Sequence, residues 1–184
     1  MNDIRKKILQ ISSSRSGRAA LMALSFVPAL AVIGLIFFFS SQNAALSGNL
    51  SYPVTAGLVG VIDRIFSLGL SGAELAAASE IYHSLVRKLA HMTEYAVLAA
   101  ALYFPLRLWR IPRPCLGAWC FCLFYAALDE FHQRFSFGRS PSFRDVCIDV
   151  SGALIGLLLA AALSALFRRL GGGTRSRSES QIPS

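Results

Sequence analysis

Long apolar runs alternate with short polar segments along this chain. Residues 19–39 are apolar apart from Ser25, which matches the roughly 20 residues that a transmembrane helix needs. The run is longer than the apolar core of a signal peptide, about 7–15 residues, so it favours a retained first span over a cleaved signal. Pro28 lies inside it and is expected to kink the helix, as membrane helices tolerate.

Three further apolar runs predict three more spans. They begin near Arg87, at Cys115 and after Ser142, and the last ends near Phe167. Ser142 is a suitable N-cap for the fourth span, with an acidic side chain at the third helical position. The predicted fold class is all-α, an integral membrane bundle of four transmembrane helices.

Residues 40–85 are too polar and too often interrupted by glycine to span a membrane. Residues 54–68 predict a short interfacial or re-entrant helix in this first outer loop. Ser71 followed by Glu74 is a capping-box pattern, so another helix is expected to start there and run towards the second span.

The chain divides into three parts with no internal repeat and no second domain. Residues 1–18 form a basic N-terminal segment, residues 19–167 the transmembrane domain, and residues 168–184 a Gly/Ser/Arg-rich tail that is expected to be disordered. Only 15% of the residues are charged, against about 25% in a typical soluble domain. Composition therefore also favours a membrane protein.

The distribution of basic residues predicts the orientation. The N-terminal segment, residues 107–113 and the tail hold 12 of the 18 Lys and Arg residues, and the opposite side holds 6. Because cytoplasmic loops carry the excess of positive charge, both termini are expected to be cytoplasmic in a multi-pass protein of the plasma membrane. No basic surface interleaved with aromatic residues and no nucleic-acid motif occurs, so the net charge of +8 does not indicate a nucleic-acid partner.

The four cysteines are expected to be free thiols packed within the membrane. Cys120 and Cys122 form a Cys-x-Cys pair, which is not a zinc spacing, and helical geometry turns the two side chains apart.

Residues 129–149 form the most polar segment between two apolar runs, and they carry four of the ten carboxylates. Charged groups close to hydrocarbon are costly, so such residues are candidates for a functional site. Asp129, Glu130 and Gln133 crowd the outer end of the third span. Arg139 follows in a turn, where its guanidinium suits a phosphate or a carboxylate; it can equally pair with the acidic residues around it.

The second span carries the complementary charges. Arg87, His91 and Glu94 are spaced i, i+4, i+7 on one helical stripe, with Lys88 and Tyr95 beside it. Glu94 lies about 10 Å deeper than Arg87 at 1.5 Å per residue. This pattern is compatible with a ligand site and also with a self-satisfied network that stabilises the bundle.

The fourth span has a stripe formed by Asp145, Asp149, Gly152 and Gly156. The two glycines are spaced as a small-residue face that lets another helix approach closely. The aspartates on the same stripe are therefore expected to point into the bundle.

We predict no metal ion and no cofactor. His91-x-x-Glu94 and Glu130-x-His132 resemble parts of a dimetal carboxylate site only incompletely, and Arg87 and Lys88 oppose a cation. No phosphate loop, nucleophile elbow or zinc-protease motif is present.

Three motifs, taken in order, resemble those of the VanZ-like family. They read Arg87-Lys88-x-x-His91-x-x-Glu94-Tyr95, then Asp129-Glu130-x-x-Gln133, then Gly138-Arg139 followed by Asp145, Asp149, Gly152 and Gly156. The resemblance covers residues 26–166 and includes Phe39-Ser40-Ser41-Gln42. It implies a small multi-pass bacterial membrane protein, in a family whose founding member is associated with low-level resistance to the glycopeptide teicoplanin. Asp149 departs from the Asn expected in many relatives and adds a buried carboxylate.

Together these observations predict a cell-envelope protein with an outward-facing polar pocket at the ends of spans two, three and four. Its expected partner is an anionic membrane lipid or a lipid-linked cell-wall precursor, with an effect on glycopeptide susceptibility. Arg87, Lys88, His91 and Arg139 are the predicted ligand-binding residues. The supporting polar network is expected to comprise Glu94, Tyr95, Asp129, Glu130, Gln133, Asp145 and Asp149.

Two other functions remain open on the sequence. A membrane-embedded enzyme acting on a lipid or wall precursor would use His91 or Glu94 in proton transfer. A proton-coupled lipid transporter would use buried Glu94 and Asp149, and with only four spans it would require a homo-oligomer.

Overall fold

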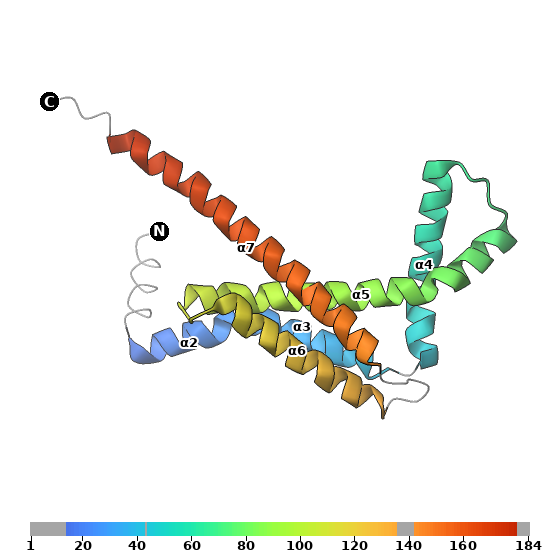
Figure 1. Ribbon diagram of the computed structural model, residues 1–184, viewed down its shortest axis with the longest axis horizontal. Coiled ribbons are helices and arrows are strands. Elements are labelled where there is room, and N and C mark those ends of the chain that lie inside the picture. Colours follow the sequence, from blue (N-terminus) through green and yellow to red (C-terminus); the bar gives the residue numbers. More distant parts are fainter. Residues whose placement is uncertain (1–13, 43, 136–141, 180–184) are drawn as a thin grey trace.

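The computed structural model describes residues 14–42, 44–135 and 142–179. These residues form six helices and no strand, so the fold is all-α as predicted. Figure 1 shows α3, α5, α6 and α7 packed together, with α2 and α4 at opposite ends of this bundle. The helices are α2 (Arg15–Ser25), α3 (Val27–Ser40), α4 (Ala44–Phe66), α5 (Gly72–Leu108), α6 (Pro114–Gln133) and α7 (Phe143–Glu179).

The first apolar run forms two helices, α2 and α3, which meet at Phe26. Pro28 occupies the second position of α3 and has no N–H to donate to the carbonyl of Leu24, which explains the break. The indole Nε1 of Trp109 donates to Ser25 Oγ at 3.0 Å. This bond joins the break to the far end of α5.

α4 is longer than the predicted interfacial helix of residues 54–68. It runs from Ala44 to Phe66 with Pro53 inside it. In Figure 1, α4 lies across the N-terminal part of α5, away from the other helices of the bundle. Its inner side buries Thr55 and Val59, one helical turn apart.

α5 is a single helix of 37 residues. The helix predicted to start after Ser71 therefore continues without a break into the second span, which was expected to begin near Arg87. The predicted capping box is confirmed. Glu74 N donates to Ser71 Oγ at 3.4 Å, and Ser71 N donates to Glu74 Oε2 at 2.8 Å. The hydrogen bond from Ser71 N lowers the pKa of the Glu74 carboxyl below its ordinary value, because it stabilises the ionised form.

The predicted basic turn connects α5 and α6. Arg110 and Arg113 adopt left-handed backbone conformations with φ of 55° and 52°, and Pro114 begins α6. A proline suits the first helical position because its missing N–H is not needed there.

α7 begins as the sequence predicts and ends later. Arg144 N donates to Ser142 Oγ at 3.2 Å, which confirms Ser142 as an N-cap. The helix continues to Glu179, past the predicted end near Phe167 and into the tail that was expected to be disordered from Arg168. Extending an existing helix adds one hydrogen bond per residue without a new nucleation cost. Residues 180–184 lie outside the described part of the chain.

Among the described residues, α5 and α7 make the most extensive helix–helix contact. A Cβ atom on Gly152 would overlap the backbone carbonyl of Met92, and one on Gly156 would overlap that of Ala96. These two contacts lie four residues apart on both helices, so the two backbones run against each other along a small-residue face.

The surface of the helices remains strongly apolar. Phe37, Phe38, Leu158 and Leu159 are all more than half exposed. Among the described residues, two stretches are long and apolar enough to cross a membrane, Arg15–Ser40 and Phe143–Arg169. α5 and α6 fall outside this pair because they carry the charged motifs, so the four-span topology stays a prediction. The four cysteines are free thiols, with Cys120 exposed and Cys122 buried, as expected.

Candidate functional site

The buried stripes of three helices become polar at the same end of the bundle. α3 buries Ala29 and Ile36 and then Ser40. α6 buries small apolar residues as far as Ala126, and then Asp129. The stripe on α7 starts at Asp149, ahead of its glycines. Because these residues follow one helical periodicity, the sequence places polar groups directly above an apolar core.

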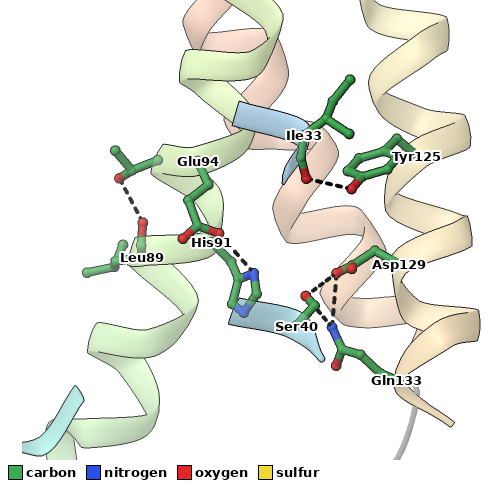
Figure 2. A network of polar contacts seen from close by, with 9 residues as sticks. Ile33, Ser40, Leu89, His91, Glu94, Tyr125, Asp129 and Gln133 are labelled. Carbon is green, nitrogen blue, oxygen red and sulfur yellow. Dashed lines mark hydrogen bonds and ion pairs between the residues drawn. The ribbon is translucent and has the colours of Figure 1, made fainter. Parts of the chain in front are cut away.

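Asp129 is the centre of a buried hydrogen-bond network between α3 and α6. Its Oδ2 accepts from Ser40 Oγ at 2.7 Å and from Gln133 Nε2 at 3.0 Å. Figure 2 shows Asp129 and Gln133 pointing from α6 towards the last turn of α3. Two donors offset part of the cost of burying this carboxyl group.

A second bond from α6 supports the start of α7. Glu130 Oε2 accepts from the backbone N–H of Ser142 at 2.8 Å. A carboxylate at a helix N-terminus is favourable because it faces unpaired N–H groups and the positive end of the helix dipole. Asp129 and Glu130 are neighbours in the sequence, yet they stabilise different helices.

Lys88 is occupied by an ion pair with α7. Its Nζ lies 2.9 Å from Asp145 Oδ1, and the two side chains are 31% and 34% exposed. This partial exposure makes the pair worth about 0–1 kcal/mol. Lys88 therefore links α5 to α7. Within the described part of the chain, Arg87 makes no such ion pair.

Asp149 is a buried carboxyl group with several acidic neighbours. Its side chain is buried, and the negative charges of Asp129, Glu130, Asp145 and Glu94 act on it through space. Among the described residues, no group donates a hydrogen bond to it. The resemblance led us to expect Asn at this position in many relatives, whereas this chain has Asp149 there.

Two tyrosines line the boundary between the polar end and the apolar core. Tyr125 Oη donates to the Ile33 carbonyl at 2.9 Å, as Figure 2 shows. Tyr95 is fully buried with its ring centroid 6.3 Å from that of Tyr125. Its hydroxyl has no hydrogen-bond partner among the described residues.

A separate cavity of about 200 Å³ lies between α3, α4 and α5. We call it the Arg87 cavity. Within it His91 Nδ1 lies 3.5 Å from Glu94 Oε2, and Figure 2 shows both side chains leaving the same side of α5. The residues that line the cavity are Phe39, Gln42, Ser51, Val54, Val86, Arg87, Ala90, His91 and Glu94.

The predicted site residues thus fall into two groups rather than one pocket. Arg87, His91 and Glu94 line the Arg87 cavity. The described acidic residues of α6 and α7 lie elsewhere: Asp129 in the buried network with Ser40 and Gln133, Glu130 at the start of α7, Asp145 in the pair with Lys88, and Asp149 buried in the bundle. Gly138 and Arg139 lie outside the described residues. Within the described part of the chain, no group of three or more His, Cys, Asp or Glu side chains is arranged to hold a metal ion.

Four polar residues of these two groups were not among the predicted site residues. Ser40 and Gln42 belong to the motif at the end of the first apolar run, but their spacing alone does not indicate what they contact. Ser51 and Ser142 are single serines in polar segments. Only the family motif provides a signal for the first two, and the packing of α3 and α4 determines their roles.

The fold and the site define an all-α protein with membrane-compatible helices and a polar, charged cluster at one end of its bundle. The sequence matches the family model for VanZ/LLP1 over residues 25–167. The chain belongs to the VanZ/LLP1 family. No curated protein and no protein of solved structure matches it.

Proposed function

We propose that this chain is a multi-pass protein of the bacterial cell membrane that binds an anionic lipid head group in the Arg87 cavity. The proposed ligands are a membrane phospholipid or a lipid-linked cell-wall precursor. Family membership and two membrane-compatible helices support the membrane setting. We propose four spans with both termini in the cytoplasm, which makes the Arg87 end of the bundle outward-facing.

The proposal rests on one observation, the partial burial of the Arg87 side chain without a hydrogen-bond or ion-pair partner among the described residues. This side chain is half-buried and lines the cavity. Among the described residues it has no hydrogen bond or ion pair, whereas its neighbour Lys88 is paired with Asp145. A partly desolvated guanidinium gains strongly from an anionic partner, and its planar set of donors fits phosphate oxygens.

The other polar groups of the cavity indicate that the head group also carries hydrogen-bond donors. The Oε1 atom of Gln42 is buried and accepts no hydrogen bond from the described residues, and Glu94 is a further acceptor. These groups repel an anion but accept from hydroxyl or ammonium donors. We therefore assign a phosphate to the Arg87 end of the cavity and donor groups of the same head group to the Gln42 and Glu94 end.

The test is native mass spectrometry of gently solubilised protein, comparing the wild type with Arg87→Gln and Arg144→Gln. Arg144 is exposed at the same end of the bundle, so Arg144→Gln removes the same charge there and is the matched control. Arg87→Gln removes a charge-assisted hydrogen bond to the ligand. We therefore expect its retention of an anionic lipid to drop about ten-fold or more. Equal retention by Arg87→Gln and Arg144→Gln, with normal helix content, contradicts the proposal.

The same variants test an effect on glycopeptides. If the Arg87 cavity holds a lipid-linked wall precursor, producing the wild-type protein changes the minimal inhibitory concentration of teicoplanin, and Arg87→Gln abolishes that change. An unchanged concentration for the wild type rules out this part of the proposal and leaves lipid binding to be judged by mass spectrometry.

A second candidate, an enzyme acting on the bound lipid, is favoured by the His91–Glu94 pair in the same cavity. A histidine oriented by a carboxylate is a common general base. The separation of 3.5 Å is too long and poorly aligned for a hydrogen bond, and such contacts often tighten only when a substrate binds. The enzyme predicts a time-dependent mass change of the bound lipid that His91→Ala abolishes while lipid retention persists. A constant lipid mass in the wild type excludes this candidate.

A further inference from the structure

A second and larger hollow lies between α4 and the first half of α5. It has a volume of about 580 Å³, within the roughly 300–1,000 Å³ typical of ligand pockets. We call it the α4–α5 groove. Its lining is almost entirely apolar and consists of Thr55, Leu58, Val59, Ile62, Leu68, Leu70, Ala78, Tyr82, Leu85, Val86 and Leu89.

The α4–α5 groove continues from the Arg87 cavity along the same two helices. Val86 of α5 lines both hollows, and on α4 the consecutive residues Val54 and Thr55 line one each. A polar compartment with a cation therefore adjoins an apolar compartment. Figure 1 shows α4 beside this part of α5, away from the crossing of α5 and α7.

The far end of the groove has a defined boundary. Leu68 and Leu70 line it there, in the turn between the two helices. The backbone N–H of Leu70 donates to Asp63 Oδ1 at 3.0 Å, and that of Leu68 donates to the Asp63 carbonyl at 3.1 Å. Gly69 adopts a φ of 67°, which a glycine permits at little cost. These bonds hold both leucines at the end of the groove.

We propose that the α4–α5 groove binds a hydrocarbon chain of the same lipid whose anionic head group occupies the Arg87 cavity. This inference rests on the proposed function and narrows its ligand to a complete amphiphile rather than a free phosphate. A lipid joins a charged head to an apolar chain in one molecule, which is the order of the two compartments. A purely apolar partner that filled only the groove would leave the adjoining Arg87 without an anion.

The length of the groove limits how much of the chain it covers. Its lining on α5 extends from Ala78 to Leu89, a rise of about 16 Å at 1.5 Å per residue. The site therefore shields a segment of one chain along this part of α5, and the rest of the lipid lies outside the groove.

Photo-cross-linking tests the proposal on full-length protein in phosphatidylcholine vesicles. The probe is a trace of phosphatidylglycerol with a diazirine at the end of one chain, and mass spectrometry maps the labelled peptides. We expect several-fold more labelling of residues 54–62 and 78–89 than of residues 158–163, where Leu158, Leu159 and Leu163 are exposed as ordinary lipid-facing residues.

Two variants probe the groove itself. Ala78→Trp fills it and should reduce labelling of α4 and α5 several-fold, while Ala77→Trp, an exposed neighbour outside the groove lining, should leave labelling unchanged. Ala78→Phe provides a smaller filling residue if the tryptophan variant loses helix content. Equal labelling by all of these folded proteins contradicts the proposal.

Arg87→Gln separates this inference from the proposed function. Loss of both lipid retention and groove labelling supports one continuous site. Loss of lipid retention, with α4 and α5 labelled no more than α7 in the wild type, overturns the groove and leaves the head-group site standing. Groove labelling that persists in Arg87→Gln shows that the chain binds independently of Arg87, and this also overturns the proposal.

Discussion

At the scale of single residues, the polar end of the bundle depends on which side chains have partners. Asp129 accepts two hydrogen bonds inside the protein, and Lys88 is paired with Asp145. These groups are largely satisfied, and a buried polar group with partners contributes to a specific packing arrangement. Arg87 instead faces a cavity. The contrast separates residues that stabilise the fold from those that remain able to bind.

Ser40→Ala should destabilise the protein because it removes one of the two donors to buried Asp129. We expect a loss of about 1–3 kcal/mol in the free energy of unfolding, the range for losing one hydrogen bond to a buried carboxyl group while Gln133 still donates to it. Reversible unfolding in mixed micelles, followed by circular dichroism, measures it. Ser41→Ala is the matched control, since Ser41 is exposed and bonds only within its own helix to Phe38. Equal stability of the two variants would show that the Ser40–Asp129 bond contributes nothing.

At the scale of helices, the close contact of α5 and α7 positions the site. The glycine face of α7 brings its backbone against Met92 and Ala96, which lie between Lys88 and the core. Asp145 and Asp149 are carried on the same side of α7. The approach of the two backbones therefore determines how deeply the carboxyl groups enter the bundle.

Gly152→Ala should force α5 and α7 apart, because the added methyl group overlaps a backbone carbonyl that cannot rotate away. We expect destabilisation of about 1–3 kcal/mol, the usual cost of overpacking. Gly34→Ala is the control at a helical glycine with no neighbouring atom within 4 Å, and it should raise stability by about 0.5–1 kcal/mol. Unfolding midpoints of both variants test the difference. If Gly152→Ala is as stable as Gly34→Ala, the close helix contact is wrong.

The N-terminus of α5 should respond to acid. The folded pKa of Glu74 is depressed by the hydrogen bond from Ser71 N. The capping bond is therefore fully present above the ordinary carboxyl pKa of 4.5 and is lost as the pH falls through the lower folded value. Amide hydrogen exchange at residues 72–76 should accelerate in that range beyond its intrinsic pH dependence. Glu74→Gln should remove the pH-dependent part, and an unchanged profile in this variant contradicts the assignment.

At the scale of the whole molecule, topology decides which compartment the Arg87 cavity faces. The described surface is apolar along α3 and α7, and two stretches satisfy the length and composition of a membrane span. α5 and α6 connect these stretches while carrying charged residues that pack against neighbouring helices. Charges inside a bundle are tolerated in a membrane when other helices cover them, which is our physical reason for proposing four spans.

Cysteine labelling tests the topology in a protein whose four cysteines have been replaced by alanine. With both termini cytoplasmic, Ser71→Cys should react with an impermeant maleimide on intact cells. Arg110→Cys, in the basic turn at the other end of α5, should react only after permeabilisation. The reverse pattern would show that both termini lie outside the cell. Labelling of both positions from one side would show that α5 does not cross the membrane.

The local features of the helices were predictable from the sequence because they depend on neighbouring residues. Short-range hydrogen bonds at the helix starts make them predictable, as with Ser71 and Glu74 before α5 and with Ser142 before α7. Pro28 marks the break between α2 and α3 because it lacks a donor. The helix start at Ser71 was predicted, but its unbroken continuation into the second span was not, because the capping box indicates only where a helix begins.

The sequence by itself determined an all-α chain, its family and the helical stripes that carry its charges. These follow from residue type and a period of 3.6, which are properties of each segment alone. The tertiary structure decided the pairing of Lys88 with Asp145 and of Ser40 with Asp129, and it assigned Arg87 to a cavity beside α4. Such contacts join residues far apart in the chain, and only the relative positions of packed helices select them from the many oppositely charged or hydrogen-bonding pairs that the composition allows.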